Sequence, residues 1–141
     1  MIKNIRHVGV VVDDVERALS FYRDLLGFEV FWDKVEQGEF VETVLNITSV
    51  RVRTIKMRSD NGCVLELLHF GQNPPATKSI RQNGLTHIAL SVIDIDQTYS
   101  LLKENKIEFL SAPQASPDKK AKVSFCRDFE GNFLELVQEL D

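Results

Sequence analysis

The feature that most constrains the fold of this chain is a glutamate inside an apolar, strand-like run, and it occurs twice. The run at 132–137 reads Asn-Phe-Leu-Glu-Leu-Val, and the run at 63–68 reads Cys-Val-Leu-Glu-Leu-Leu. Each half of the chain also has a histidine at the head of an apolar run, at His7 and His87. A carboxylate in a buried strand is unfavourable unless a cation meets it. The repeat therefore predicts two similar halves, each with one histidine and one glutamate in matching places.

Both halves follow the same order of expected elements, which is strand, helix and three strands (βαβββ). In the first half we expect strands at 5–12, 28–33, 50–58 and 63–70, a helix after Asp13-Asp14 that ends at Gly27, and a short helix or turn at 38–46. In the second half we expect strands at 86–92, 107–110, 122–127 and 132–138, a helix from Asp94 to Asn105, and a polar loop at 111–120. This order predicts an α+β fold.

One stretch has the composition of a linker. Residues 71–84 contain two glycines and two adjacent prolines, which favour turns and loops. We therefore expect a single domain over residues 1–141, built from modules 1–70 and 85–141 that are joined by this linker.

The alternation of side chains along a strand assigns the polar groups to faces. His7 shares a face with Gly9, opposite the valines at 8, 10 and 12. His87 likewise lies opposite large branched side chains, with small residues on its own face. Glu66 and Glu135 each alternate with leucines that should face the core. All four polar groups are therefore predicted on the open faces of their strands.

Two imidazoles and two carboxylates are suitable ligands for a borderline divalent ion such as Ni²⁺, Co²⁺, Zn²⁺, Mn²⁺ or Fe²⁺. The alternative is that each histidine is a satisfied core residue and that each glutamate pairs with an arginine. The arginines available for such pairs, together with Lys56, are also candidates for binding an anionic part of a substrate, unless they are simply solvated: Arg51, Arg53 and Arg127. His69 has the parity of the core leucines, and we expect it to point away from Glu66.

Composition excludes several classes of function. The 141 residues carry a net charge of −4, so we do not expect nucleic acid as a partner. No apolar run approaches the roughly 18 residues of a membrane span, and no signal-peptide pattern is present. Cys63 and Cys126 do not form a disulfide framework, so we expect a cytoplasmic protein with no membrane partner.

These motifs resemble the vicinal oxygen chelate superfamily, which includes glyoxalases, bleomycin resistance proteins and extradiol dioxygenases. The resemblance covers nearly the whole chain and rests on Arg-His-Val-Gly-Val at 6–10, Ala-Leu-Ser-Phe-Tyr-Arg-Asp-Leu-Leu-Gly-Phe at 18–28, Thr-His-Ile-Ala-Leu at 86–90 and Asp-Phe-Glu-Gly-Asn-Phe-Leu-Glu-Leu at 128–136. It implies sheets cupped around a metal site, with helices on the convex face. The ligands that it implies are His7, Glu66, His87 and Glu135.

The implied ligand set is similar to that of glyoxalase I, and methylmalonyl-CoA epimerase differs mainly by a glutamine at the first glutamate. The resemblance thus implies a small-molecule substrate and proton transfer beside a chelated carbonyl, with Glu66 or Glu135 as the base. Glu42, in the 38–46 segment, is a second candidate base or lid residue, and the alternative that we favour is a residue on a solvated helix face. The alternatives are an Fe(II) extradiol-type dioxygenase and a non-catalytic binding or antibiotic-resistance protein. A homodimer is expected, with each site formed within one chain or across two.

Overall fold

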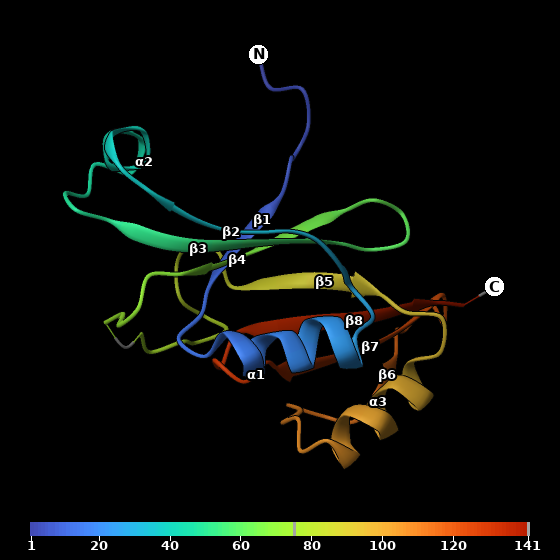
Figure 1. Cartoon of the computed structure of the whole chain (residues 1–141). Coiled ribbons are helices and arrows are strands. Elements are labelled where there is room, and N and C mark those ends of the chain that lie inside the picture. The colour runs from blue at the N-terminus through green and yellow to red at the C-terminus, as the bar shows by residue number, and fades with distance from the viewer. Residues whose placement is uncertain (75, 141) are drawn as a thin grey trace. The chain divides into compact units, whose positions relative to one another are not determined.

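The computed structural model describes residues 1–74 and 76–140, and the chain divides into two compact units, residues 1–75 and 76–141. Each unit contains a four-stranded sheet, ordered β1-β4-β3-β2 in the first unit and β5-β8-β7-β6 in the second (Figure 1). In the first sheet β1 runs parallel to β4, and in the second sheet β5 runs parallel to β8. All other neighbouring strands of the two sheets are antiparallel. These features confirm the α+β fold and the two βαβββ modules predicted from the sequence.

The first unit has four strands, two helices and one π-helical turn: β1 (Val8–Val11), α1 (Val15–Leu19), η1 (Ser20–Leu25), β2 (Glu29–Gln37), α2 (Glu39–Leu45), β3 (Arg51–Arg58) and β4 (Val64–His69). The predicted cap of α1 is present, because the Asp14 carboxylate accepts a hydrogen bond of 3.0 Å from the Arg17 backbone N–H. The helix does not stay α-helical to Gly27. In η1 the Leu26 N–H bonds the Phe21 carbonyl, five residues earlier, which is π-helical spacing.

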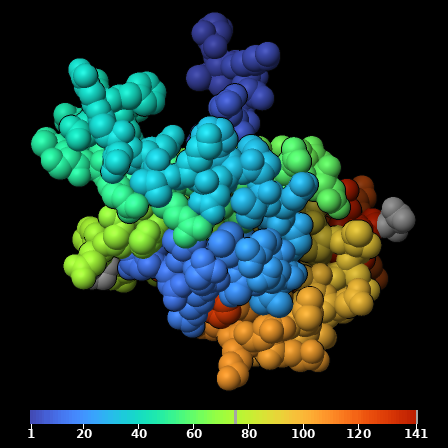
Figure 2. Space-filling view, viewed as in Figure 1, coloured from blue at the N-terminus to red at the C-terminus, as the bar shows by residue number. Residues whose placement is uncertain are grey.

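The two faces of the first sheet differ in burial. One face carries the buried side chains of Val10, Ile55, Met57, Leu65 and Leu67. On the other face α2 packs through Val41 against Val50 and Val52, with Leu68 and Phe70 beside them. Beyond this contact α2 is at the surface (Figure 2), and the Phe40 side chain is 81% exposed.

The second unit has four strands and one helix: β5 (His87–Ser91), α3 (Ile95–Glu104), β6 (Gln114–Ala115), β7 (Ala121–Arg127) and β8 (Phe133–Glu139). Asp94 caps α3 as predicted, accepting a hydrogen bond of 2.9 Å from the Gln97 backbone N–H. The expected strand at 107–110 is reduced to a bridge between Phe109 and Cys126. The Ile107 N–H is already bonded to the end of α3, at the Leu102 carbonyl. The short strand β6 lies instead in the segment expected to be a polar loop.

The segment with linker composition contains no helix or strand at residues 71–74 and 76–84, and residue 75 lies outside the described residues. The organisation as one domain of two modules stays a prediction. In the portions of the chain described above, no helix is long and apolar enough to cross a membrane.

Candidate functional site

His7 and Glu66 lie on the same face of the first sheet. In the parallel pairing of β1 with β4, Gly9 is opposite Glu66, and His7 precedes Gly9 by two residues. A Cβ at Gly9 would lie 3.6 Å from Leu68 Cδ1, which places Gly9 on this face as well. The His7 Nε2 atom is 3.7 Å from Glu66 Oε1. The two side chains therefore lie together on one face of the first sheet, as strand parity predicted, while their role as metal ligands stays a prediction.

Glu66 is a largely buried residue whose carboxylate has two cationic neighbours. Its side chain is 12% exposed, and Lys56, directly across on β3, places its Nζ 3.7 Å from Oε2. Both this distance and the His7 distance exceed a normal hydrogen bond. No hydrogen bond among the described residues reaches the Glu66 carboxylate. Its oxygens therefore keep free lone pairs, which is the condition that a metal ligand requires.

The second unit contains a matching pair on the equivalent strands. Ala89 of β5 is opposite Glu135 of β8, and His87 Nε2 lies 3.3 Å from Glu135 Oε2. The Thr86 hydroxyl is 2.8 Å from His87 Nδ1, which leaves Nε2 as the nitrogen that faces the carboxylate. The ring of Phe125, across from Glu135 on β7, packs edge-on against the imidazole at 5.1 Å. This histidine is thus held in a defined orientation.

The donor atoms of both pairs fit a divalent cation of the kind predicted from the sequence, since each pair presents an imidazole nitrogen and a carboxylate. Within residues 1–74 and 76–140, no group of three or more His, Cys, Asp or Glu side chains that could hold a metal ion is found. The convergence of all four predicted ligands on one ion stays a prediction. These contacts differ from the alternative in which each glutamate pairs with an arginine. Glu66 contacts His7 and Lys56, and Glu135 contacts His87.

The arginines proposed to meet an anionic substrate occupy different positions. Arg53 is opposite His69, on the face away from Glu66, and donates two hydrogen bonds of 2.8 and 2.7 Å to Asp33. These bonds lower the pKa of the Asp33 carboxyl. His69 thus lies on the face expected from its parity. Arg127 lies on the Glu135 face, with its guanidinium 4.3 Å from the ring of Phe133 and its buried Nε without a hydrogen-bond partner.

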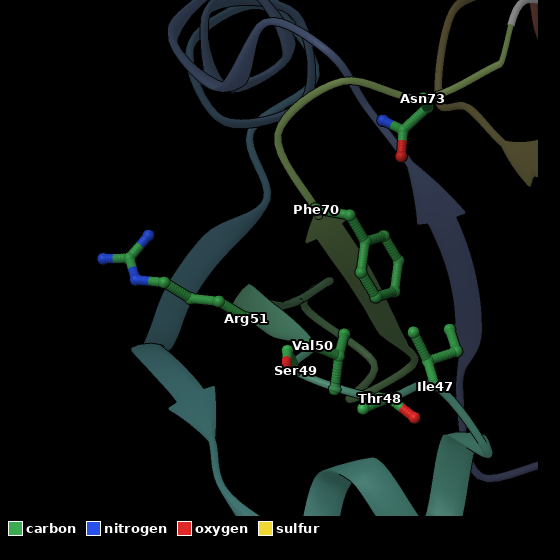
Figure 3. A pocket seen from close by; sticks show the side chains of 7 residues that line it. All are labelled: Ile47, Thr48, Ser49, Val50, Arg51, Phe70 and Asn73. Carbon is green, nitrogen blue, oxygen red and sulfur yellow. The ribbon is translucent and has the colours of Figure 1, made fainter.

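A cavity of about 340 Å³ lies beyond the end of β4 in the first unit, and Figure 3 shows the residues that line it: Ile47, Thr48, Ser49, Val50, Arg51, Phe70 and Asn73. Its wall is largely apolar. The Arg51 guanidinium is directed away from Phe70 and Val50 (Figure 3). Phe70 is an even number of residues from Glu66, so the two side chains point to the same face of the sheet. Phe70 follows Glu66 by four residues, and at about 3.3 Å per residue the cavity begins about 13 Å along the chain from Glu66.

The sequence reasoning missed two residues on the Glu66 face, Trp32 and Lys34. The register places Trp32 opposite Lys56 and Lys34 opposite Thr54, so these four side chains share the face. The Lys34 and Lys56 ammonium nitrogens are 4.2 and 5.4 Å from the centre of the Trp32 ring. A register shift between Val30 and Trp32 sets this alignment, and no residue in the sequence marks it. Glu42, the second candidate base, is a half-buried residue of α2.

Comparison with known proteins gives consistent matches over most of the chain. The family model described as Glyoxalase/Bleomycin resistance protein/Dioxygenase superfamily matches residues 4–136. The mitochondrial methylmalonyl-CoA epimerase of Mus musculus is 34% identical over 140 residues, which are 95% of this chain and 72% of that protein. A probable lactoylglutathione lyase of a Synechocystis strain is 27% identical over 133 residues, covering 94% and 92% of the two chains.

Solved structures share the fold. A glyoxalase family protein from Bacillus cereus aligns with a TM-score of 0.89 at 22% identity, covering 100% of this chain and 97% of that chain. The fosfomycin resistance protein FosX from Listeria monocytogenes aligns with a TM-score of 0.66 at 14% identity, covering 99% and 95%, and was solved in complex with Mn(II) and sulfate.

Proposed function

Because the chain belongs to the Glyoxalase/Bleomycin resistance protein/Dioxygenase superfamily, we propose that it is a metal-dependent enzyme that transfers a proton beside a metal-chelated carbonyl. The reaction would be an isomerisation of the epimerase type or a lyase reaction, the activities named for the two relatives above. The observation that carries the proposal is the matched His–Glu pair of each unit, at 3.7 Å between His7 and Glu66 and at 3.3 Å between His87 and Glu135.

His7, Glu66, His87 and Glu135 would hold the ion. A bound divalent cation polarises the substrate carbonyl and lowers the cost of an enolate. Glu66 and Glu135 are the candidate bases that accept the α-proton and return it, a transfer that typically accelerates a reaction by ~10²–10⁴-fold. The packing of Phe125 and the Thr86 hydroxyl against the imidazole would keep His87 in position for this chemistry.

The presence of two carboxylates favours proton transfer over oxygen-dependent cleavage. An extradiol-type reaction needs a position for O₂ in addition to the two oxygens of the substrate, and two histidines with one glutamate leave that position free. Glu66 would occupy it as a fourth protein ligand. Its buried carboxylate, with no hydrogen bond among the described residues, supports this role.

Isotope exchange tests the reaction class. The protein is reconstituted with each of the five ions in D₂O and offered 2-oxoaldehyde–thiol hemithioacetals, 2-methylacyl thioesters and catechols. We expect deuterium at the α-carbon of a carbonyl substrate, and we expect Glu135→Gln to abolish it while His69→Gln retains it. Oxygen uptake with a catechol and no exchange would overturn the proposal in favour of a dioxygenase. Binding without either reaction would favour the non-catalytic alternative.

Three accompanying features are part of the same proposal. The chain would act as one domain of two modules, and two chains would form a homodimer, since each sheet has open edge strands at β1 and β5. A cytoplasmic location is supported by two free cysteines, Cys63 and Cys126.

A further inference from the structure

The chain contains two Asn-Gly sequences, one at Asn61-Gly62 and one at Asn83-Gly84. An asparagine followed by glycine readily loses its side-chain amide, because the glycine has no side chain to hinder attack of its backbone nitrogen on the amide carbon. The attack also needs a backbone nitrogen that is free of hydrogen bonds and an asparagine side chain that can turn towards it. The hydrogen bonds at the two sites decide whether these conditions are met.

Asn61 is held in the hairpin turn between β3 and β4. The Gly62 N–H donates a hydrogen bond of 2.8 Å to the Ser59 carbonyl. The Asn61 Oδ1 atom accepts hydrogen bonds from the Ser59 hydroxyl and, at 3.2 Å, from the Cys63 N–H. Attack of the Gly62 nitrogen on the Asn61 side chain would break all three bonds, so the folded turn protects this asparagine.

Asn83 has none of these restraints. The residue is exposed, and within residues 1–74 and 76–140 neither its side-chain amide nor the Gly84 N–H makes a hydrogen bond. A Cβ at Gly84 would meet no atom within 4 Å, so the space around the attacking nitrogen is open. Both conditions for the attack are therefore met at Asn83 in the folded protein.

We propose that Asn83 is a site of spontaneous deamidation in the native protein and that Asn61 is protected by its turn. The Gly84 nitrogen gives its proton to a base and forms a bond to Asn83 Cγ. The bond from Cγ to the amide nitrogen breaks, and that nitrogen takes up a proton and leaves as ammonia, which produces a cyclic imide. Water then opens the ring at either carbonyl and gives aspartate or isoaspartate. The chemistry needs no metal ion and is independent of the proposed reaction.

The modification alters the segment that leads into the second sheet. Both products carry one negative charge more than the original amide, so modified chains form a more acidic species. Asn83 precedes His87, the first residue of β5, by four residues. In the isoaspartate form the main chain runs through the former side chain, which lengthens the connection to β5.

Peptide mass spectrometry measures the two sites separately. The whole chain is incubated at mildly alkaline pH and digested with trypsin, which places Asn61 in peptide 59–78 and Asn83 in peptide 82–103. Replacement of –NH₂ by –OH raises the mass of the modified peptide. Asn73, also in the first peptide, precedes Pro74, whose nitrogen has no proton to lose.

We expect Asn83 to deamidate faster than Asn61 by about tenfold or more, because the folded turn must first lose three hydrogen bonds. Asn83→Gln should abolish the change in peptide 82–103, because the longer side chain closes a ring much less readily. Equal native rates at the two sites, or faster loss at Asn61, would overturn the proposal.

Two further measurements test the protection of Asn61 by the fold. Ser59→Ala removes one donor to the Asn61 oxygen and should accelerate deamidation at Asn61 while leaving the rate at Asn83 unchanged. In urea the turn is lost, and the two rates of the wild-type chain should become similar, since both asparagines precede glycine. A preference for Asn83 that persists unchanged in urea would overturn the proposal, because it would then arise from the local sequence and not from the folded turn.

Discussion

Glu66 differs from a structural carboxylate of the same sheet. Asp33 accepts two short hydrogen bonds from Arg53, and its side chain remains 38% exposed. Glu66 is more deeply buried, and its two cationic neighbours both lie at 3.7 Å. The Asp33 oxygens are therefore occupied by hydrogen bonds, whereas the Glu66 oxygens remain available to a ligand. The comparison supports the assignment of Glu66, rather than Asp33, to the metal-ligand set.

The histidines of the first unit provide a matched pair of variants. His7→Ala removes a proposed ligand and should weaken metal binding by more than about tenfold, because loss of a residue that only hydrogen-bonds to a metal ligand already costs ~10–100-fold. His69→Ala removes an imidazole from the opposite face and should leave the metal content unchanged. Elemental analysis after dialysis against a metal buffer measures both. Loss of metal from the His69 variant would contradict the face assignment.

The two cysteines should react very differently. Burial, together with the charge of Asp128, raises the pKa of the Cys126 thiol from 9.0 to about 12. The thiolate is the reactive form, so Cys126 should resist an aromatic disulfide reagent at pH 8 while exposed Cys63 reacts. One thiol should titrate in the native protein and two after denaturation; two equally fast native reactions would contradict this. Because the folded-state pKa is raised, the stability linked to this proton is complete below pH 9 and is lost as the pH rises toward 12.

At the scale of elements, the sequence predicted helix starts, because these depend on residues that are close together in the chain. The caps at Asp14 and Asp94 mark the starts of α1 and α3, because a side-chain oxygen there accepts a hydrogen bond from a backbone N–H. The extension of β2 to Gln37 could not be predicted, since nearly all of its side chains are exposed and no apolar alternation marks the strand. The segment 107–110 has a strand-like composition. The Ile107 N–H, however, donates a hydrogen bond to the Leu102 carbonyl in α3 and is therefore not available for pairing with a strand.

The cap of α3 gives a test at this scale. Asp94→Ala removes the acceptor of the 2.9 Å bond from the Gln97 N–H and should lower the free energy of unfolding by about 0.5–2 kcal/mol. Asp94→Asn retains a side-chain oxygen at the same place and should lose much less. Urea denaturation of the three proteins measures the difference. Equal stabilities of the alanine and asparagine variants would show that this hydrogen bond does not stabilise the helix.

For the molecule as a whole, the sequence predicted the strand faces on which the histidine and the glutamate of each unit lie, because side-chain parity is fixed once a strand is recognised. It did not predict the neighbours of Glu66, because their placement depends on which strands pair and in what register. Lys56 reaches Glu66 across the hairpin between β3 and β4, and Trp32 and Lys34 reach the same face only through the shifted register of β2. Tertiary pairing, rather than local pattern, thus sets the composition of the site.

The homodimer is tested by sedimentation. The edge strands β1 and β5 are short and leave backbone groups available for a second chain. We expect a mass of twice 16.1 kDa at micromolar concentration and above. A single species of 16.1 kDa at tens of micromolar would contradict the proposal.

Metal stoichiometry tests whether both His–Glu pairs bind the same ion. If His7, Glu66, His87 and Glu135 hold one ion, each chain should bind one equivalent. The melting temperature should then rise with free metal, by the equivalent of about 2.7 kcal/mol at one hundred times the dissociation constant. Because the ion needs ligands from both modules, His7→Ala and His87→Ala should each remove most of this stabilisation. Two equivalents per chain, or one equivalent retained in the His87 variant, would show that each pair binds independently and would contradict a single four-ligand site.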